Sequence, residues 1–213
     1  MDLARHIEQT LLRPEATAAD VEAHCRRAAE YQLFGVCIAS RFVPLARRSV
    51  EGTGVRVVTV VAFPHGAVPS SVKAAEARNA VEDGADELDM VISVGDARAG
   101  DFAAVERDVR AVRDATAGRV LKVILETGFL SDEQIDGAAR AAVSAGADFV
   151  KTSTGYGPRG ATVADIERLV RAVEGRAGVK ASGGIRTRDA ALEMLNAGAS
   201  RIGTSSGVEM VAR

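Results

Sequence analysis

The chain has 213 residues, of which 47% are hydrophobic and 26% are charged, as is typical of a globular protein. Its 27 basic and 29 acidic residues leave a formal charge of −2, and only 4% of the residues are aromatic, which argues against nucleic-acid binding. No apolar run approaches the roughly 20 residues of a membrane-spanning helix, and the first residues show no signal-peptide pattern. We therefore expect a cytoplasmic protein with no membrane partner.

Cysteine and histidine are both scarce. Cys25 and Cys37 are too few for a disulfide framework, which favours a reducing compartment. His6, His24 and His65 have no metal-ligand spacing, either among themselves or with the cysteines. We therefore expect no metal site.

Short apolar runs rich in Val and Ile alternate with longer amphipathic stretches along the whole chain. This alternation predicts parallel β–α units, and because no linker interrupts it we interpret residues 1–213 as one domain. The predicted strands cover 6–10, which is the weakest, 35–39, 55–63, 87–92, 121–126, 148–154, 178–183 and 201–205. The predicted helices cover 19–31, 41–50, 70–84, 101–116, 131–146, 162–175 and 187–198.

A weak internal repeat supports this interpretation. Gly84, Gly146 and Gly198 each follow a predicted helix and precede Ala and a strand, which fits the position where a chain turns left-handed to leave a helix. Eight such strands predict a (β/α)8 TIM barrel. Few residues follow the last strand, so we expect the last helix to be short or missing. An open doubly wound sheet is the alternative.

Strand alternation places polar side chains on one face of several predicted strands. Their apolar neighbours must pack against helices outside a barrel, so the polar face points inward. We expect four side chains to converge there: Asp89, Lys122, Lys151 and Lys180. We expect Cys37 and Thr59 beside them.

Lysine is rare in this chain, since only four of the 27 basic residues are Lys and the other 23 are Arg. Lysine is therefore expected where the chemistry needs a primary amine, because a guanidinium does not deprotonate and act as a nucleophile. One inward lysine alone would be interpreted as a strand-end residue or as part of a structural ion pair. Three inward lysines are harder to explain in that way, and crowding and burial lower the pKa of an amine, so that one can be neutral near pH 7.

This group of residues predicts a metal-free aldolase. A neutral lysine amine attacks a carbonyl to form a Schiff base, which acts as an electron sink when a neighbouring C–C bond is made or broken. Asp89 could relay protons through water. Such a reaction needs no cofactor.

Glycine-rich segments follow the last two predicted strands. SGGIRT (182–187) opens a helix, and GTSSGVEM (203–210) could open another. Backbone N–H groups and hydroxyls at these positions bind phosphate, and barrels often place a phosphate site after strands 7 and 8. We therefore expect a small phosphorylated aldehyde or sugar as substrate, although each segment taken alone could be only a tight turn.

Five segments together closely resemble the 2-deoxyribose-5-phosphate aldolase family: GADELDMVI (84–92), LKVILETG (121–128), KTSTG (151–155), VKASGGIRT (179–187) and IGTSSG (202–207). The resemblance extends from Ile7 to about Gly207. It implies a class I aldolase of deoxyribonucleotide catabolism, which reversibly cleaves 2-deoxy-D-ribose 5-phosphate to D-glyceraldehyde 3-phosphate and acetaldehyde. It also suggests a homodimer.

The resemblance implies a role for each matching residue. Lys151 resembles the Schiff-base nucleophile, Lys180 the second lysine that lowers its pKa, and Asp89 the proton donor and acceptor. Lys122 resembles a further lysine near the substrate. Cys37 matches a family cysteine near the aldehyde site. The alternative interpretation is that Cys37 is only a small core residue that faces inward. The other implied substrate and phosphate contacts are Thr154, Gly155, Gly183, Gly184, Ser205 and Ser206.

The first predicted strand departs from the family pattern. The family usually has Ile-Asp-His-Thr-Leu-Leu-Lys-Pro, whereas this chain has Glu8, Gln9 and Arg13 at the Asp, His and Lys positions. Glu8 keeps a carboxylate near Lys180 but adds a methylene, so the geometry of the ion pair could shift. Some members of the family carry a longer C-terminal tail with a tyrosine that assists proton transfer, and the residues up to Arg213 do not include a match to it. Lys73 matches a family helix lysine, but its pattern predicts a solvated residue.

Two other functions remain open on the sequence alone. One is another Schiff-base sugar-phosphate aldolase or a transaldolase. The other is a weakly active barrel that only binds phosphosugars, which the substitutions at Glu8 and Gln9 motivate.

Overall fold

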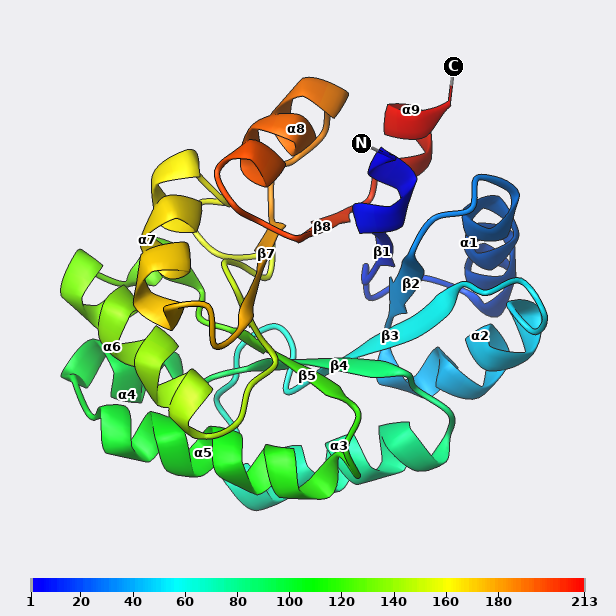
Figure 1. Ribbon diagram of the computed structural model, residues 1–213. Coiled ribbons are helices and arrows are strands. Elements are labelled where there is room, and N and C mark those ends of the chain that lie inside the picture. Colours follow the sequence, from blue (N-terminus) through cyan, green and yellow to red (C-terminus); the bar gives the residue numbers. More distant parts are fainter. Residues whose placement is uncertain (1, 213) are drawn as a thin grey trace.

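A computed structural model describes residues 2–212 of the chain. Eight parallel strands form a closed barrel in chain order, and the last strand pairs with the first through Ile7 and Ile202 (Figure 1). This closure confirms the predicted TIM barrel and excludes the open doubly wound sheet. The strands are β1 (Ile7–Leu11), β2 (Gly35–Ile38), β3 (Arg56–Val61), β4 (Glu87–Val91), β5 (Val120–Ile124), β6 (Phe149–Lys151), β7 (Gly178–Ser182) and β8 (Arg201–Thr204).

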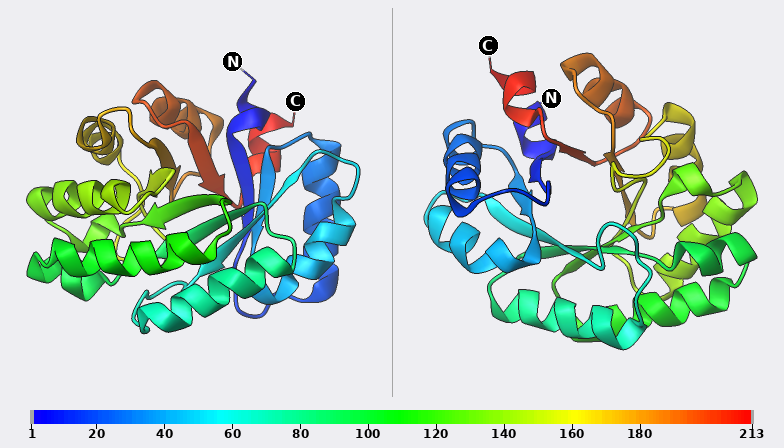
Figure 2. Two further views of the ribbon diagram at one scale, coloured as in Figure 1. Left: turned by 60° about the horizontal axis from the view of Figure 1, so that its bottom comes forward. Right: turned by 180° about the vertical axis from the view of Figure 1, so that it is seen from behind.

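Helices surround the barrel on its outside (Figures 1 and 2). The α-helices are α1 (Ala18–Glu30), α2 (Val43–Ser49), α3 (Ser70–Glu82), α4 (Val94–Ala99), α5 (Phe102–Ala115), α6 (Asp132–Ser144), α7 (Val163–Val173), α8 (Arg188–Asn196) and α9 (Gly207–Val211). Three short 3-10 helices are η1 (Leu3–His6), η2 (Ser40–Phe42) and η3 (Thr127–Phe129). The last helix, α9, has only five residues, as expected, and it lies beside η1.

Local sequence signals set the ends of several helices. Capping boxes start α1 at Thr17 and α6 at Ser131, where the side chain and the backbone exchange hydrogen bonds with the third helical residue. Gly84, Gly146 and Gly198 have φ of 103°, 92° and 108°, the left-handed conformation predicted for helix exits.

Several elements differ from the predicted ones: β6 ends at Lys151 and not at residue 154, and η1 and η3 were not predicted. Strand β3 ends at Val61 because Ala62 has a left-handed φ of 55°, so residues 62 and 63 leave the sheet. The sequence pattern did not predict α4, a helix of six residues that ends at Gly100. Gly100 has a φ of 76°, which separates α4 from α5.

The apolar core lies between the strands and the helices. Ile7, Val36, Leu88, Val123 and Val150 all belong to this outer layer and are fully buried. Cys37, Val58 and Val60 form a separate small cluster, which belongs to the interior face of the strands. The predicted alternation is thus confirmed for most strands.

Two predictions about single residues are wrong. The register pairs Thr59 with Ile38 and Leu88, which face outward, so Thr59 lies on the helix side, and its hydroxyl donates to Ile38 O. Lys73 is not solvated. It is fully buried and donates to Asp108 Oδ2 at 2.6 Å, because α3 packs against α5 along that side.

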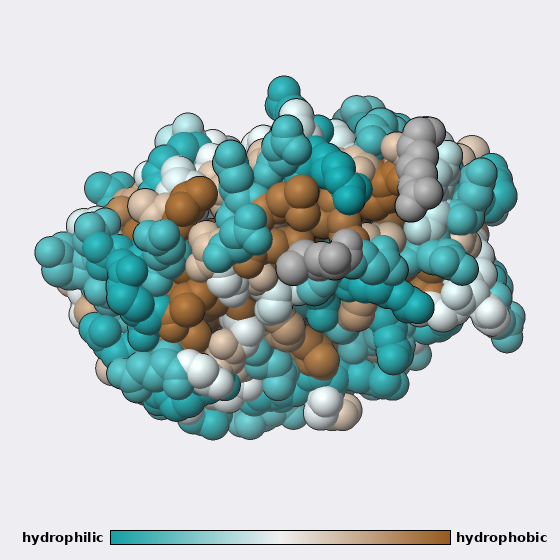
Figure 3. Space-filling view, turned by 45° about the horizontal axis from the view of Figure 1, so that its top comes forward, coloured by the Kyte–Doolittle hydropathy of each residue, from teal (hydrophilic) through white to brown (hydrophobic). Residues whose placement is uncertain are grey.

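The surface is mixed. On the side where α8, α9 and the chain ends lie, apolar patches emerge between hydrophilic side chains (Figure 3). No helix within residues 2–212 has both the length and the apolar character needed to span a bilayer.

Candidate active site

Asp89 lies at the centre of the barrel interior and accepts hydrogen bonds from three strand lysines. Its Oδ1 accepts from Lys122 Nζ at 2.8 Å, and its Oδ2 accepts from Lys151 Nζ and Lys180 Nζ, both at 2.7 Å. The register explains this convergence, because Asp89 pairs with Lys122 across β4 and β5, and Lys151 pairs with Lys180 across β6 and β7. The predicted meeting of these four side chains is confirmed.

Three further charged side chains extend this cluster. Glu8 accepts from Lys180 Nζ and, at 2.8 Å, from Arg201 Nη1. Glu87 accepts from Arg201 Nη1 at 3.1 Å and lies 2.6 Å from Lys122 Nζ. The cluster therefore holds four cations and three carboxylates, and every carboxylate contacts at least two cations.

Sequence reasoning missed Glu87 and Arg201. Glu87 lies two residues before Asp89 on the same strand face, so alternation could have placed it inside. Arg201 opens β8, and its guanidinium carbon lies 3.5 Å from the ring centroid of Phe34 and 5.3 Å from that of Phe149. Aromatic rings from β6 and from the chain before β2 thus flank the guanidinium, and this contact depends on barrel closure.

The opposite charges set the protonation states in the cluster. Burial alone would raise the pKa of Glu8 and of Asp89, but the neighbouring lysines lower the pKa of Glu8 and hold that of Asp89 well below its usual value. Burial alone would lower the pKa of Lys122 and of Lys180, yet Asp89 and Glu8 raise both. The expectation that crowding makes an amine neutral is therefore wrong for these two lysines, because the carboxylates outweigh the repulsion.

The three lysines differ in their partners and in their access to solvent. Among the described residues, Lys122 has three carboxylates within ion-pair distance and Lys180 has two, whereas Lys151 has one, Asp89. Lys122 and Lys180 are fully buried, while Lys151 lines a cavity at the carboxyl ends of the strands. Lys151 is the amine of this cluster that a small molecule in the cavity can reach.

The cavity has a volume of about 390 Å³, a size that suits a small metabolite. Five of the predicted substrate contacts line it: Thr154, Gly155, Gly183, Gly184 and Ser205. Ser206 does not line it, and neither do Cys37 and the cluster residues Glu8, Asp89, Lys122 and Lys180, which are all buried. Lys180 lies directly behind the wall, since a Cβ added at Gly203 would lie 3.1 Å from Lys180 Cε.

Sequence reasoning missed several lining residues, among them Arg13, Tyr156 and Arg186. Arg13 and Arg186 bring positive charge to the cavity, and Arg186 belongs to the SGGIRT segment that predicted a phosphate site. Tyr156 is 54% exposed, donates from its hydroxyl to Leu12 O at 3.1 Å, and packs edge-on against Phe63. No sequence pattern marks such contacts between loops.

Two glycines bring the loops after β6 and β7 into contact. Ala161 N donates to Gly183 O at 3.1 Å, and a Cβ added at Gly160 would lie 2.1 Å from that same oxygen. Gly183 and Gly184 have φ of 89° and 77°, a conformation that glycine adopts without strain. The backbone of the predicted phosphate loop is therefore fixed by its neighbour.

Two polar side chains hold the other loops at the cavity. Gln9 accepts from Gly207 N at 2.7 Å and donates to Ser205 O at 2.9 Å, so it fixes the loop after β8. Glu126 accepts from Thr154 N at 3.2 Å and also from the Thr154 hydroxyl. Gln9 stands where the family usually has His. Its side-chain amide accepts one hydrogen bond and donates another, and both bonds hold the loop that contains Ser205.

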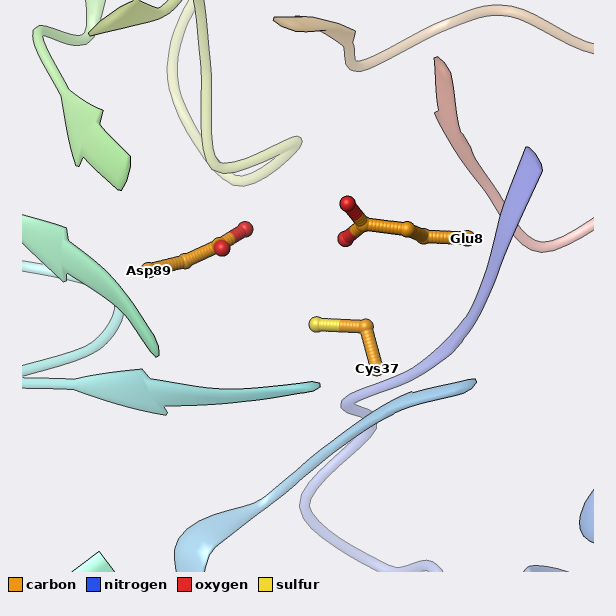
Figure 4. A group of neighbouring side chains, drawn as sticks. All are labelled: Glu8, Cys37 and Asp89. Atoms are coloured by element: carbon orange, nitrogen blue, oxygen red, sulfur yellow. The ribbon is translucent and has the colours of Figure 1, made fainter. Parts of the chain in front are cut away.

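Glu8, Cys37 and Asp89 turn their polar ends toward one another, within 4.8 Å (Figure 4). This group resembles a metal site in its residue types, but the lysine ammonium groups already occupy the carboxylate oxygens. Burial raises the pKa of Cys37 to about 11, so its thiol stays protonated at neutral pH. A cation placed here would have to displace ammonium groups and a thiol proton, so these residues do not favour one.

Comparison with known proteins decides the family. A family model described as DeoC/LacD family aldolase matches residues 4–211. The chain belongs to this family. It is 54% identical to deoxyribose-phosphate aldolase from Thermus thermophilus over 100% of this chain and 96% of that protein. It is also 54% identical to the enzyme of that name from Deinococcus radiodurans, over 99% of this chain and 96% of that protein.

Solved structures support the assignment to the DeoC/LacD aldolases. The deoxyribose phosphate aldolase from Aeropyrum pernix, described as tetrameric, superposes with a TM-score of 0.91 at 37% identity, over 98% of this chain and 89% of that chain. A mandelate oxidase, at 19% identity and a TM-score of 0.65, shares the barrel fold alone. The similarity to the aldolases thus covers both sequence and fold.

Proposed function

We propose that this protein is a class I aldolase that reversibly cleaves 2-deoxy-D-ribose 5-phosphate into D-glyceraldehyde 3-phosphate and acetaldehyde, a reaction of deoxyribose phosphate catabolism. Membership of the DeoC/LacD aldolases and the names of two relatives at 54% identity support this substrate. One observation carries the mechanism. Among the three clustered lysines, Lys151 alone lines the cavity, and it has a single carboxylate partner.

Lys151 is the nucleophile of the proposed reaction. Its Nζ adds to the C1 aldehyde of the open-chain sugar, and loss of water gives a Schiff base. The C2–C3 bond then breaks, its electron pair moves toward the iminium nitrogen, and the C3 hydroxyl gives up its proton, which releases glyceraldehyde 3-phosphate. Protonation of the remaining enamine at C2, followed by hydrolysis, frees acetaldehyde and Lys151. The reverse sequence forms the C–C bond.

Asp89 and Lys180 support this amine. Both Lys151 and Lys180 donate to Asp89 Oδ2. Asp89 and Glu8 raise the pKa of Lys180, so Lys180 keeps a fixed positive charge beside the Asp89 oxygen that it shares with Lys151. Asp89, which accepts hydrogen bonds from all three lysines, relays protons through water in the proposed reaction, while Lys122 holds its Oδ1.

The phosphate of the substrate is proposed to lie at the loops after β7 and β8. Gly183 and Gly184 precede α8 and Ser205 follows β8, all on the cavity wall together with Arg186. Backbone N–H groups before a helix and an arginine side chain suit a phosphate dianion. Ser206, the remaining predicted ligand, stays a prediction, since its side chain does not line the cavity.

A cleavage assay on 2-deoxyribose 5-phosphate with the wild type and Lys151→Ala tests the proposal. We expect turnover by the wild type and its loss in Lys151→Ala, while Arg78→Ala on the exposed face of α3 keeps it. Thermal unfolding of both variants checks that they fold. Equal turnover with and without the Lys151 amine would overturn the proposal.

The same assay separates the alternatives. Preferred cleavage of ribose 5-phosphate or of fructose phosphates would indicate another Schiff-base aldolase or a transaldolase. Binding of sugar phosphate with no difference in turnover between wild type and Lys151→Ala would indicate a barrel that only binds. Three buried amines favour the enzyme, because binding alone does not require their desolvation.

We also propose a cytoplasmic homodimer in which the whole chain forms one catalytic domain. The pairing of β1 with β8 supports the single domain, and the two buried free cysteines support a reducing compartment. The apolar patches on the face where α8 and α9 lie (Figure 3) support self-association. Light scattering after size-exclusion chromatography would contradict the homodimer if it gave a monomer or a tetramer.

A further inference from the structure

Arg13 lies at the rim of the active-site cavity, on the segment that follows β1. It lines the cavity together with Arg186, which follows β7. In the barrel β8 lies between β7 and β1. The two arginines therefore lie on the segments that follow the two neighbours of β8, the strand that precedes Ser205. An anion bound at the end of β8 would therefore have an arginine on either side.

The charge of the cavity wall has one sign. Among its described lining residues, three are basic, Lys151, Arg13 and Arg186, and none is a carboxylate. Lys151 is committed to the aldehyde end of the substrate in the proposed reaction. The other two cations thus remain for the opposite, phosphorylated end, whose charge at neutral pH is about −1.5 to −2.

Neighbouring carboxylates orient the Arg13 guanidinium without enclosing it. Arg13 Nη2 lies 3.0 Å from Asp20 Oδ1, and Arg13 Nε lies 3.7 Å from Glu15 Oε1. Asp20 is itself fixed, since its Oδ2 accepts from Thr17 N and from the Thr17 hydroxyl at 2.8 Å in the capping box of α1. The Arg13 side chain stays 40% exposed.

We propose that Arg13 is a second cationic ligand of the substrate phosphate and sets part of the preference for phosphorylated over unphosphorylated sugars. The capping box of α1 holds Asp20, Asp20 holds Arg13, and the guanidinium donates to a phosphate oxygen from the β1 side. This inference rests on the proposed function for its substrate. The binding of an anion beside Arg13 is a separate property that needs no turnover.

Kinetics on two sugars test the assignment. For wild type, Arg13→Gln and Arg13→Lys, kcat and KM are measured with 2-deoxyribose 5-phosphate and with unphosphorylated 2-deoxyribose. We expect Arg13→Gln to raise KM for the phosphorylated sugar about tenfold, the loss of one charge-assisted hydrogen bond. The ratio of kcat/KM between the two sugars should fall by the same factor, and Arg13→Lys should be intermediate.

The matched control is Arg27→Gln. Arg27 lies on α1, is similarly exposed, and pairs with Glu209 Oε1 at 2.8 Å, but it does not line the cavity. It should keep the wild-type ratio. A ratio in Arg13→Gln equal to that of wild type, or an equal loss with both sugars, would overturn the assignment.

Calorimetric titration with inorganic phosphate separates this inference from the proposed function. If the wild type cleaves neither sugar, the proposed function fails, but weaker phosphate binding in Arg13→Gln than in Arg27→Gln still supports Arg13 as an anion ligand. Equal phosphate affinity in wild type, Arg13→Gln and Arg27→Gln would overturn it whatever the turnover. Circular dichroism of each variant confirms that the barrel is folded.

Discussion

The carboxylate partners of each buried lysine decide what that lysine can do. Lys122 and Lys180 are held as ammonium groups by two or three carboxylates each, whereas Lys151 shares one oxygen of Asp89 and reaches the cavity. The rarity of lysine and the alternation of strand residues predicted which amines point inward. They did not predict all of the partners: alternation could have placed Glu87 beside Lys122, but Arg201 meets Glu8 and Glu87 only once the barrel closes.

The buried cluster should make stability depend on pH at both ends of the scale. The pKa values of Glu8 and Asp89 are lowered from 4.5 and 3.8, so their stabilisation is present above these values and lost as pH falls through the lowered ones. The pKa values of Lys122 and Lys180 are raised from 10.5, so their stabilisation is present below 10.5 and lost as pH rises through the raised ones.

The measurement is the melting temperature as a function of pH for wild type and Glu8→Gln. Glu8→Gln removes one carboxylate from this coupling, so its melting temperature should be lower near neutral pH and should fall less steeply toward acid pH. The alkaline side should change less steeply too, because Glu8 helps to raise the pKa of Lys180. Parallel curves for the two proteins would contradict this account.

Helix α3 connects the outer layer to the strand that carries Asp89. Lys73 Nζ donates to Val91 O, the last carbonyl of β4, at 2.8 Å, and Glu76 Oε2 accepts from Ala62 N just after β3 at 2.8 Å. Ser40, the first residue of η2 after β2, donates to the other Glu76 oxygen at 3.1 Å. The helical pattern of α3 predicted its position but not these contacts, because a lysine on a helix is usually solvated.

Replacing Lys73 should destabilise the protein strongly. Lys73→Met leaves Asp108 buried with only Ser70 as partner, and breaking a buried pair costs about 3–5 kcal/mol in the free energy of unfolding. Urea denaturation measures this change. Lys73→Met combined with Asp108→Leu should recover part of the loss, and Arg78→Met on the exposed face should change stability by less than about 0.5 kcal/mol. A Lys73→Met variant as stable as Arg78→Met would refute the role of the pair.

The contact between the loops after β6 and β7 should be intolerant of a side chain. Gly160→Ala places a Cβ 2.1 Å from Gly183 O, so the phosphate loop must move. We expect kcat/KM for 2-deoxyribose 5-phosphate to fall by about tenfold to a hundredfold, as misplacement of a binding group does. Gly95→Ala in α4 is the control, since its Cβ meets no heavy atom within 4 Å. Similar kinetics in both variants would show that the contact does not position Gly183.

At the scale of the whole molecule, the sequence predicted the eight strands and the closed barrel because period-two alternation and glycine helix exits repeat along the chain. Local patterns could not predict features that depend on packing between elements. Thr59 faces outward because of the register of β2, β3 and β4, and α4 is too short to show a helical period. The cavity residues Arg13 and Tyr156 come from segments after β1 and β6 that meet only in the folded barrel.

The central claim is that Lys151 forms the Schiff base. The most direct measurement is treatment of the protein with acetaldehyde and borohydride, followed by peptide mass spectrometry. The account predicts one ethyl group on the peptide that contains Lys151, and none on the peptides of Lys122 and Lys180, whose amines are buried and paired with several carboxylates. No adduct, or an adduct at Lys122 or Lys180 in place of Lys151, would contradict it.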